Sequence, residues 1–260
     1  MRWCRFQNRE AASYGIIEGD DVIAIDGSPF GQYQQTSERY SLSSVNLLVP
    51  VIPPTFYAAG LNYREHVIES AAKRGEEPKF PPNADIGYRA NNALCAHEDP
   101  IVKPKDAGEV FQYEGELVAV IGKQGRKIPA NKALDHVFGW TIGNDVSERT
   151  WQRGDRTLWR AKNADSFKPM GPWIVSDLDY RTMTTVIRLN GEEVDRFATA
   201  NMIHDVETYI ATVSRYCTLY PGDVVWMGTD GTPRNMKPGD VCEVEITGIG
   251  TLRNPIVAEG

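Results

Sequence analysis

The chain contains 260 residues, 41% of them hydrophobic, which is enough to bury a full core in one or two globular domains. Its formal net charge of −7 and the lack of any Lys/Arg run argue against a nucleic-acid partner, because such binding depends on basic patches. The first residues lack a basic start followed by an apolar stretch, and Pro50, Pro53 and Pro54 interrupt the most apolar segment, so we expect a cytoplasmic protein without a membrane partner.

The first 50 residues are expected to form a small N-terminal β domain. The segment YGIIEGDDVIAIDG predicts a hairpin, because its apolar runs are separated by Glu18-Gly19-Asp20 and followed by Asp26-Gly27. The Pro-rich VPVIPP that follows is typical of a junction. The sequence therefore predicts a second, larger domain at residues 51–260.

The larger domain begins with a predicted strand in FYAAGLNY and a helix over REHVIESAAKRG, which Gly75 is expected to end. From Phe80 onward, Gly, Pro and Asp turns separate strand-like runs such as ELVAVIG, FGWTIGNDV, GPWIVS, TTVIRLNGEEV, DVVWMGTDG and DVCEVEITGIG. One amphipathic helix is predicted over residues 202–216, which end shortly before Pro221-Gly222. The pattern predicts a mainly β (α+β) fold with few helices.

Two carboxylates two residues apart are the first candidate site. Glu114 and Glu116 lie in the strand-like FQYEGELVAVIG, and a strand sends residues i and i+2 to the same face. Such a pair is tolerated on an exposed face, or in a pocket where a cation or a shared proton compensates the repulsion. Asp145, at the polar end of WTIGNDV, adds a third carboxylate. Because the four cysteines stand apart without CxxC spacing, a metal here would be a hard ion such as Mg²⁺ or Mn²⁺ rather than Zn²⁺.

A second set of candidates could move protons and bind an anion. His66 and Glu69 are three residues apart in the predicted helix, so Glu69 is a candidate to orient His66 as a base, although this spacing is also common on surface helices. Arg149 and Gln152 follow Asp145 closely, and Lys162 lies in LWRAKNADSF. These donors suit an anionic 2-oxo acid, while a surface salt bridge is the alternative for each charged residue.

A series of segments, from about Ala59 to Pro255, occurs in an order and at separations that are characteristic of one family. They are GLNYREH with Glu69, YEGELVAVIG, GWTIGNDVSERTWQ, WRAKNADSFKPMGPWIV, LNGEEV, LYPGDVVWMGTDGTP and VEITGIGTLRN. Together they resemble the fumarylacetoacetate hydrolase family, and several ordered motifs are far more specific than one short pattern. The first 50 residues match this family only loosely.

The resemblance implies a mixed β-roll of curved sheets with few helices, and a homodimer. It also implies a catalytic domain with one Mg²⁺ or Mn²⁺ in each subunit. The E-x-E metal ligands of the family fall on Glu114 and Glu116, and its third carboxylate falls on Asp145.

The resemblance further implies catalytic and substrate-binding roles. The His-x-x-Glu dyad of the family, carried by a lid that closes over the substrate, falls on His66 and Glu69, and its active-site lysine falls on Lys162. Its substrate-contacting Arg and Gln positions match Arg149 and Gln152.

Two departures from the family pattern concern the substrate. MGTDGTPRN stands where the family commonly has T-G-T-P-x-G-V, so Thr229 is the substrate-contacting position that carries over. GYRANNAL stands where many members have a Phe-x-Lys segment, so Arg89 or Asn91 is expected to line the pocket differently.

The leading hypothesis is hydrolysis of a C–C bond in a small acylpyruvate-like β-diketo acid through a metal-bound enolate. In this scheme Glu69 and His66 deprotonate a water, and Lys162 stabilises the developing charge. Decarboxylation of oxaloacetate or isomerisation of a 2-hydroxy-dienedioate is the alternative, because all three reactions pass through the same enolate. A binding module that has lost its chemistry is the alternative from another class. A Rossmann oxidoreductase is disfavoured, because no helix follows TGIGTL.

Overall fold

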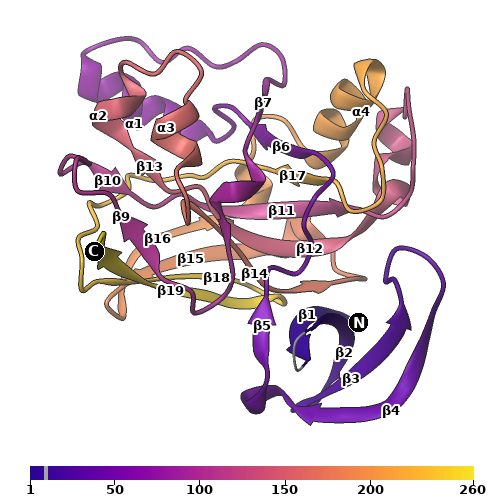
Figure 1. Cartoon of the computed structure of the whole chain (residues 1–260). Coiled ribbons are helices and arrows are strands. Elements are labelled where there is room, and N and C mark those ends of the chain that lie inside the picture. The colour runs from indigo at the N-terminus through magenta and orange to yellow at the C-terminus, as the bar shows by residue number, and fades with distance from the viewer. Residues whose placement is uncertain (9–10) are drawn as a thin grey trace.

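The computed structural model describes residues 1–8 and 11–260 and is dominated by a large mixed sheet (Figure 1). Within the described residues this sheet has twelve strands. Its path runs through β4 (Tyr33–Ser41), β3 (Asp21–Gly27), β2 (Ala11–Glu18), β1 (Arg2–Asn8), β14 (Lys168–Val175), β12 (Val137–Asn144), β11 (Gly115–Ile121), β17 (Val224–Trp226), β6 (Phe56–Ala59) and β7 (Ile86–Tyr88). Two short strands lie off this path, β5 (Asn46–Leu48) beside β1 and β8 (Leu94–Cys95) beside β14.

Smaller sheets and short helices complete the fold. The second sheet, of five strands in the described part of the chain, runs β16 (Glu192–Ala198), β15 (Thr184–Leu189), β18 (Val241–Ile246), β19 (Gly250–Ala258) and β9 (Ile101–Lys103). A two-stranded ribbon joins β10 (Phe111–Gln112) and β13 (Ser147–Glu148). The helices are α1 (Arg64–Arg74), α2 (Arg149–Gln152), α3 (Trp159–Asn163) and α4 (Val206–Tyr216), together with short 3₁₀ turns. None of the helices in the described residues is long and apolar enough to cross a membrane.

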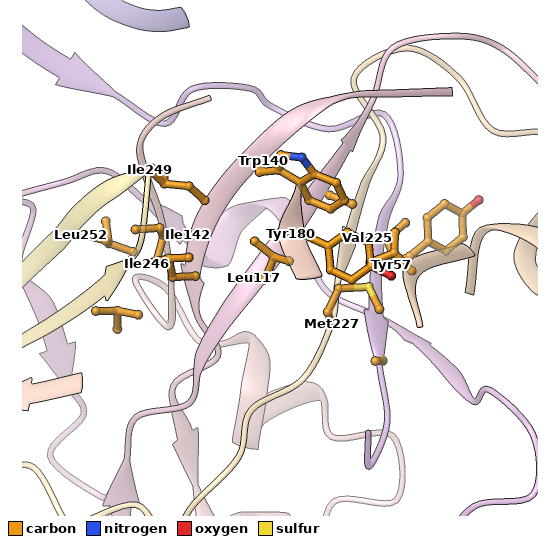
Figure 2. Close-up of a cluster of buried hydrophobic side chains, with 14 of the residues drawn as sticks. Tyr57, Leu117, Trp140, Ile142, Tyr180, Val225, Met227, Ile246, Ile249 and Leu252 are labelled. Carbon is orange, nitrogen blue, oxygen red and sulfur yellow. The ribbon is translucent and has the colours of Figure 1, made fainter. Parts of the chain in front are cut away.

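Strand β11 shows how the sequence builds the centre of the molecule. All seven of its residues are buried, and the apolar run LVAVI supplies both faces of the strand after Glu116. Leu117 joins the core that β18 and β19 also line, and Figure 2 shows it among Ile142, Ile246 and Leu252. Val118 points to the opposite face and belongs to a second core. Each fully buried side chain of this kind stabilises the fold by about 1.5–3 kcal/mol, so both faces hold the strand in place.

Most of the elements expected from the sequence are present, and the expected fold class is confirmed. The N-terminal hairpin is formed by β2 and β3, with Glu18 opposite Asp21. Helix α1 ends where expected, because Gly75 adopts a φ of 68° that suits glycine. The amphipathic helix starts later than expected, at Val206, because the Asp205 side chain caps it by accepting from the Thr208 N–H at 2.8 Å. Helices α2 and α3 and strand β19 were not expected.

Candidate metal centre

Three carboxylates meet where β11 begins and β12 ends. The two strands are antiparallel neighbours with Glu116 opposite Gly143, so Asp145, directly after β12, lies beside Glu114, directly before β11. The backbone fixes this corner, because the Asp145 N–H donates to the Glu114 carbonyl oxygen at 2.8 Å and the Glu114 N–H donates to Asn144 Oδ1 at 2.9 Å. One carboxylate oxygen from each of Glu114, Glu116 and Asp145 lies within 4.8 Å of the others, and all three residues are buried.

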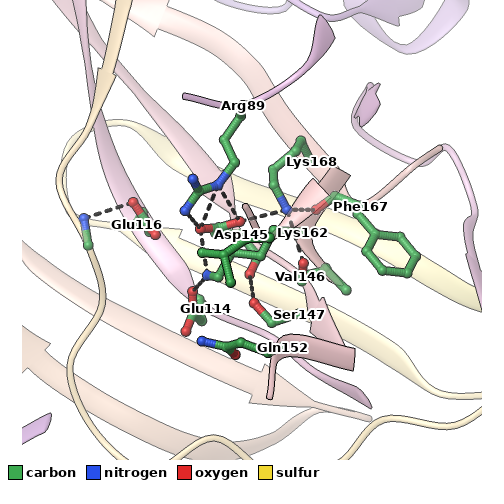
Figure 3. A network of polar contacts seen from close by, with 12 residues as sticks. Arg89, Glu114, Glu116, Asp145, Val146, Ser147, Gln152, Lys162, Phe167 and Lys168 are labelled. Atoms are coloured by element: carbon green, nitrogen blue, oxygen red, sulfur yellow. Dashed lines mark hydrogen bonds and ion pairs between the residues drawn. The ribbon is translucent and has the colours of Figure 1, made fainter. Parts of the chain in front are cut away.

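A set of cations surrounds two of these carboxylates (Figure 3). Arg89 donates to Asp145 through Nη2 at 2.8 Å, and Lys168 Nζ lies 2.6 Å from Asp145 Oδ1. Lys162 Nζ lies between two acids, 2.8 Å from Asp145 Oδ2 and 2.5 Å from Glu114 Oε2. Arg149 Nη2 donates to Glu114 Oε1 at 2.6 Å. The described residues therefore bring four cationic side chains to Glu114 and Asp145.

The different neighbours give the three carboxyl groups different charges. Burial raises the pKa of Glu114, but Arg149 and Lys162 outweigh it and lower that pKa to about 2. Burial also opposes ionisation of Asp145, yet Arg89, Lys162 and Lys168 hold its pKa well below the usual range. Burial, together with Asp145 and Glu114, raises the pKa of Glu116 to about 8. The surroundings therefore favour the ionised form of Glu114 and Asp145 and the protonated form of Glu116.

Glu116 also provides a test of whether the site fits a metal ion. Its Oε2 accepts a hydrogen bond from the Gly228 N–H at 2.8 Å, and in the described part of the chain its carboxyl group has no other hydrogen-bond partner. A buried carboxyl beside two carboxylates, with no cationic partner among the described residues, is a costly arrangement that a divalent cation would relieve. The donor set consists of three carboxylate oxygens, which suit Mg²⁺ or Mn²⁺. The residues present fit a divalent metal ion.

The carboxylates open into a cavity of about 160 Å³. Most of the residues that the sequence marked as candidates line it: His66, Glu114, Glu116, Asp145, Arg149, Gln152, Lys162 and Thr229. Gln152 Oε1 accepts from Arg149 Nη1 at 2.8 Å, so helix α2 holds this guanidinium against Glu114. Whether each of these residues has the role expected of it stays a prediction.

His66 and Glu69 are held by a loop and not by each other. His66 Nδ1 lies 2.9 Å from the carbonyl oxygen of Gly231, and the Glu69 carboxylate accepts from the Thr232 hydroxyl group. Within the described residues no hydrogen bond joins His66 to Glu69, and Glu69 is not part of the cavity wall. Because a carbonyl oxygen can only accept, Nδ1 carries the hydrogen, and in the neutral ring Nε2 keeps its lone pair. The expectation that Glu69 orients His66 is therefore not met in this arrangement.

Sequence reasoning missed part of the site. The sequence offered either Arg89 or Asn91 as a residue of the pocket wall. Arg89 lines the cavity, whereas the Asn91 side chain donates to the Pro53 carbonyl oxygen at 2.9 Å. Lys168 was not anticipated, because it opens the apolar strand KPMGPWIV and nothing in that pattern predicts a fully buried lysine. The contact between His66 and Gly231 joins residues 165 positions apart, which no local pattern shows.

Comparison with known families covers nearly the whole chain. Residues 55–257 match the family model described as fumarylacetoacetate (FAA) hydrolase C-terminal, and residues 1–50 match the model described as Rv2993c-like, N-terminal. Protein Rv2993c of Mycobacterium tuberculosis is 35% identical over 273 residues, which cover 100% of this chain and 99% of that protein.

Two further relatives have names that state an activity. Oxaloacetate tautomerase YisK of Bacillus subtilis is 33% identical over 258 residues, which cover 93% of this chain and 84% of that enzyme. The crystal structure of 5-carboxymethyl-2-hydroxymuconate delta-isomerase from Mycobacterium smegmatis superposes with a TM-score of 0.90 at 35% identity, covering 100% of both chains.

Proposed function

This chain belongs to the fumarylacetoacetate hydrolase family, and from that premise we propose that it is a divalent-metal-dependent tautomerase or isomerase of a small 2-oxo dicarboxylic acid. The observation that carries the proposal is the pairing of His66 Nδ1 with the Gly231 carbonyl, because it leaves Nε2 as a single base at the cavity while Glu69 is bound by Thr232 outside the cavity wall. Proton transfer needs one such base, whereas hydrolysis needs an activated water as well.

The charges of the pocket support an anionic substrate. Four cationic side chains, three ionised carboxylates and a divalent ion would together carry a formal charge of about +3, which a dianion would offset in large part. A cavity of about 160 Å³ is smaller than the pockets that take drug-sized ligands, which favours a substrate of few heavy atoms. The compounds in the names of two relatives are small polycarboxylates: oxaloacetate is a dianion and 5-carboxymethyl-2-hydroxymuconate is a trianion.

The proposed reaction is a proton shift between carbon and oxygen. The divalent ion, held by Glu114, Glu116 and Asp145, would supply Lewis-acid polarisation of the 2-oxo group. His66 Nε2 removes the proton from the carbon next to that group, and the same proton returns to oxygen, so no atom is gained or lost. Lys162, whose ammonium contacts Glu114 and Asp145, donates toward the oxygen on which negative charge develops. Arg149, held by Gln152, binds a substrate carboxylate.

Hydrolysis of an acylpyruvate is the second candidate. Glu69 lies one helical turn after His66 on α1, and this position favours a water-activating dyad if the Thr232 contact is released. Decarboxylation of oxaloacetate uses the same enolate without an activated water.

A substrate panel tests these reactions. Metal-stripped protein is assayed with oxaloacetate, a 2-hydroxy-dienedioate and an acylpyruvate, with and without added Mg²⁺ or Mn²⁺. For a tautomerase we expect the enol absorbance to fall only when metal is added back, without release of CO₂ or of a second acid. Release of pyruvate plus an acid would favour hydrolysis, and CO₂ would favour decarboxylation.

We also propose that the protein is a homodimer. Light scattering measures its mass in solution, and a monomer would contradict this proposal.

A further inference from the structure

The segment 228–231 contacts both the candidate base and a candidate metal ligand. We propose that Asp230 and Gly231 are positioning residues, in which Asp230 caps helix α1 from outside the helix and the Gly231 carbonyl selects the tautomer of His66. The inference rests on the proposed function only for the role of His66 as the base. Neither Asp230 nor Gly231 contacts the three carboxylates that would hold the metal, so their effect on the reaction is indirect.

Helix α1 lacks a cap of its own. Its N-cap residue is Tyr63, whose side chain makes no capping hydrogen bond, so the first N–H groups of the helix need partners from elsewhere. Asp230 Oδ1 accepts from the His66 N–H at 2.9 Å, across 164 residues of sequence. A carboxylate at a helix N-terminus also interacts favourably with the helix dipole. Asp230 therefore fixes the backbone of His66 relative to the loop.

The next residue fixes the ring of His66. The Gly231 N–H donates to Asp230 Oδ1 at 3.0 Å, and the Gly231 carbonyl faces His66 Nδ1 at 2.9 Å. Gly231 has a φ of 77°, and a Cβ atom there would collide with the Asp195 carboxylate. Glycine is thus required by both conformation and space, and it turns the carbonyl toward the ring.

The other end of the same segment is bound to the candidate metal site. The Gly228 N–H donates to Glu116 Oε2 at 2.8 Å, three residues before the Gly231 carbonyl. A short segment with a hydrogen bond at each end therefore sets the spacing between Glu116 and His66. A shift of the base by about 1 Å can reduce a rate on the order of 100-fold, so this spacing matters for the reaction.

Nitrogen NMR of the histidine rings tests the inference without reference to turnover. The chain has four histidines, so the His66 signals can be assigned by their loss in His66→Gln. In ¹⁵N-labelled wild-type protein with Mg²⁺ at a pH where the ring is neutral, we expect a protonated Nδ1 and an unprotonated Nε2. The opposite tautomer in the wild-type protein would overturn the proposal, and this reading needs no variant that might fail to fold.

Variants separate positioning from helix stability. In Asp230→Ala we expect averaged His66 tautomer signals and a kcat lower by roughly 10- to 100-fold, with Mg²⁺ affinity unchanged. Asp230→Asn keeps an acceptor oxygen and should restore the His66 signals and most of kcat. Asp205→Ala is the matched control, because it removes the side-chain cap of α4, a helix of 11 residues like α1. It should lower the melting temperature without changing the His66 signals or kcat.

Two results would overturn the inference. One is an Asp230→Ala protein with unchanged His66 signals, and the other is an Asp205→Ala protein that loses as much kcat as Asp230→Ala. If the wild-type protein turns over none of the three substrates, the proposed function fails while the NMR result still decides the positioning role.

Discussion

At the scale of single residues, the neighbours favour the ionised form of two of the three buried carboxyl groups and disfavour it in the third. Glu114 and Asp145 have cationic partners at 2.8 Å or less, whereas Glu116 has a backbone N–H at 2.8 Å. Burial disfavours the ionised form of all three, and only the neighbours differ. Glu116 is therefore the ligand whose proton must leave before a cation can bind.

Metal affinity should depend on pH because of Glu116. Its pKa is raised to about 8, so metal binding below pH 8 releases one proton. We expect the apparent affinity for Mg²⁺ to rise about tenfold per pH unit from pH 6 to 8 and to level off above. Calorimetric titration in two buffers of different ionisation enthalpy measures the proton release. Glu116→Gln is the control, and it should bind weakly with no such slope; a flat affinity in the wild-type protein would contradict the assignment.

Lys168 should be important for stability. Its ammonium is fully buried and donates to the carbonyl oxygens of Val146 at 3.0 Å and Phe167 at 2.9 Å, besides its ion pair with Asp145. Lys168→Met removes this donor from the Val146 carbonyl and leaves Asp145 without one of its buried cationic partners, while the Phe167 carbonyl still accepts from the Val146 N–H at 3.1 Å. We therefore expect the free energy of unfolding to fall by about 3–5 kcal/mol. Urea unfolding measures this. Lys132→Met is the control, because Lys132 pairs with Asp135 on the surface, and it should change stability by less than about 1 kcal/mol.

At the scale of elements, the ends of strands and helices carry the site, and this decides what the sequence can predict. Apolar runs predicted β11, β12 and β14, because their burial follows directly from composition. The carboxylates at the ends of these strands were found because Glu114 and Glu116 are two residues apart in a strand-like segment and Asp145 lies at the polar end of another. Helices α2 and α3 were missed, because four or five residues give no periodicity. Distant segments contact both helices, Glu114 through Arg149 in α2 and Ala90 through Asn163 in α3.

The side-chain contacts across the site could not be predicted from the sequence either. Lys168 and Arg89 reach Asp145 from separate parts of the large sheet, and only the fold brings them together. The partners of His66 and Glu69 lie in the loop after β17, so their spacing on one helix suggested a pairing that the fold does not make. Local spacing predicts which residues share a face, but not which distant group competes for their hydrogen bonds.

The C-terminal end of α1 offers a test at this scale. Gly75 has a φ of 68°, and its N–H donates to the Ala72 carbonyl oxygen at 3.1 Å. A Cβ atom would meet nothing within 4 Å, so the cost of Gly75→Ala is conformational and should be about 1 kcal/mol in urea unfolding. Gly31→Ala is the matched control, because Gly31 also has open space but no positive φ. An equal loss in both variants would show that the helix cap is not the cause.

At the scale of the whole molecule, the first 50 residues and the rest share one sheet and part of one core. Strand β1 pairs with β14, where Trp3 lies opposite Ile174. Trp3 is 5% exposed and its ring lies 5.5 Å from that of Phe138 in β12, while the Phe30 ring lies 4.9 Å from the same Phe138. In Figure 1 the strands β1 to β4 form a lobe at one end of the molecule, yet its apolar side chains continue into the body.

This shared core predicts that the chain unfolds in one step. Two independent domains would give two calorimetric transitions, whereas a core that spans both segments couples them, so we expect one peak whose van't Hoff and calorimetric enthalpies agree. Trp3→Ala removes the ring that joins the segments and should lower the free energy of unfolding by about 3–5 kcal/mol. Trp159→Ala is the control, because Trp159 is 66% exposed and its loss should shift the peak little. If Trp3→Ala instead gives two peaks and shifts only the smaller one, residues 1–50 unfold independently. The coupling of the two segments through the contacts of Phe138 would then be wrong.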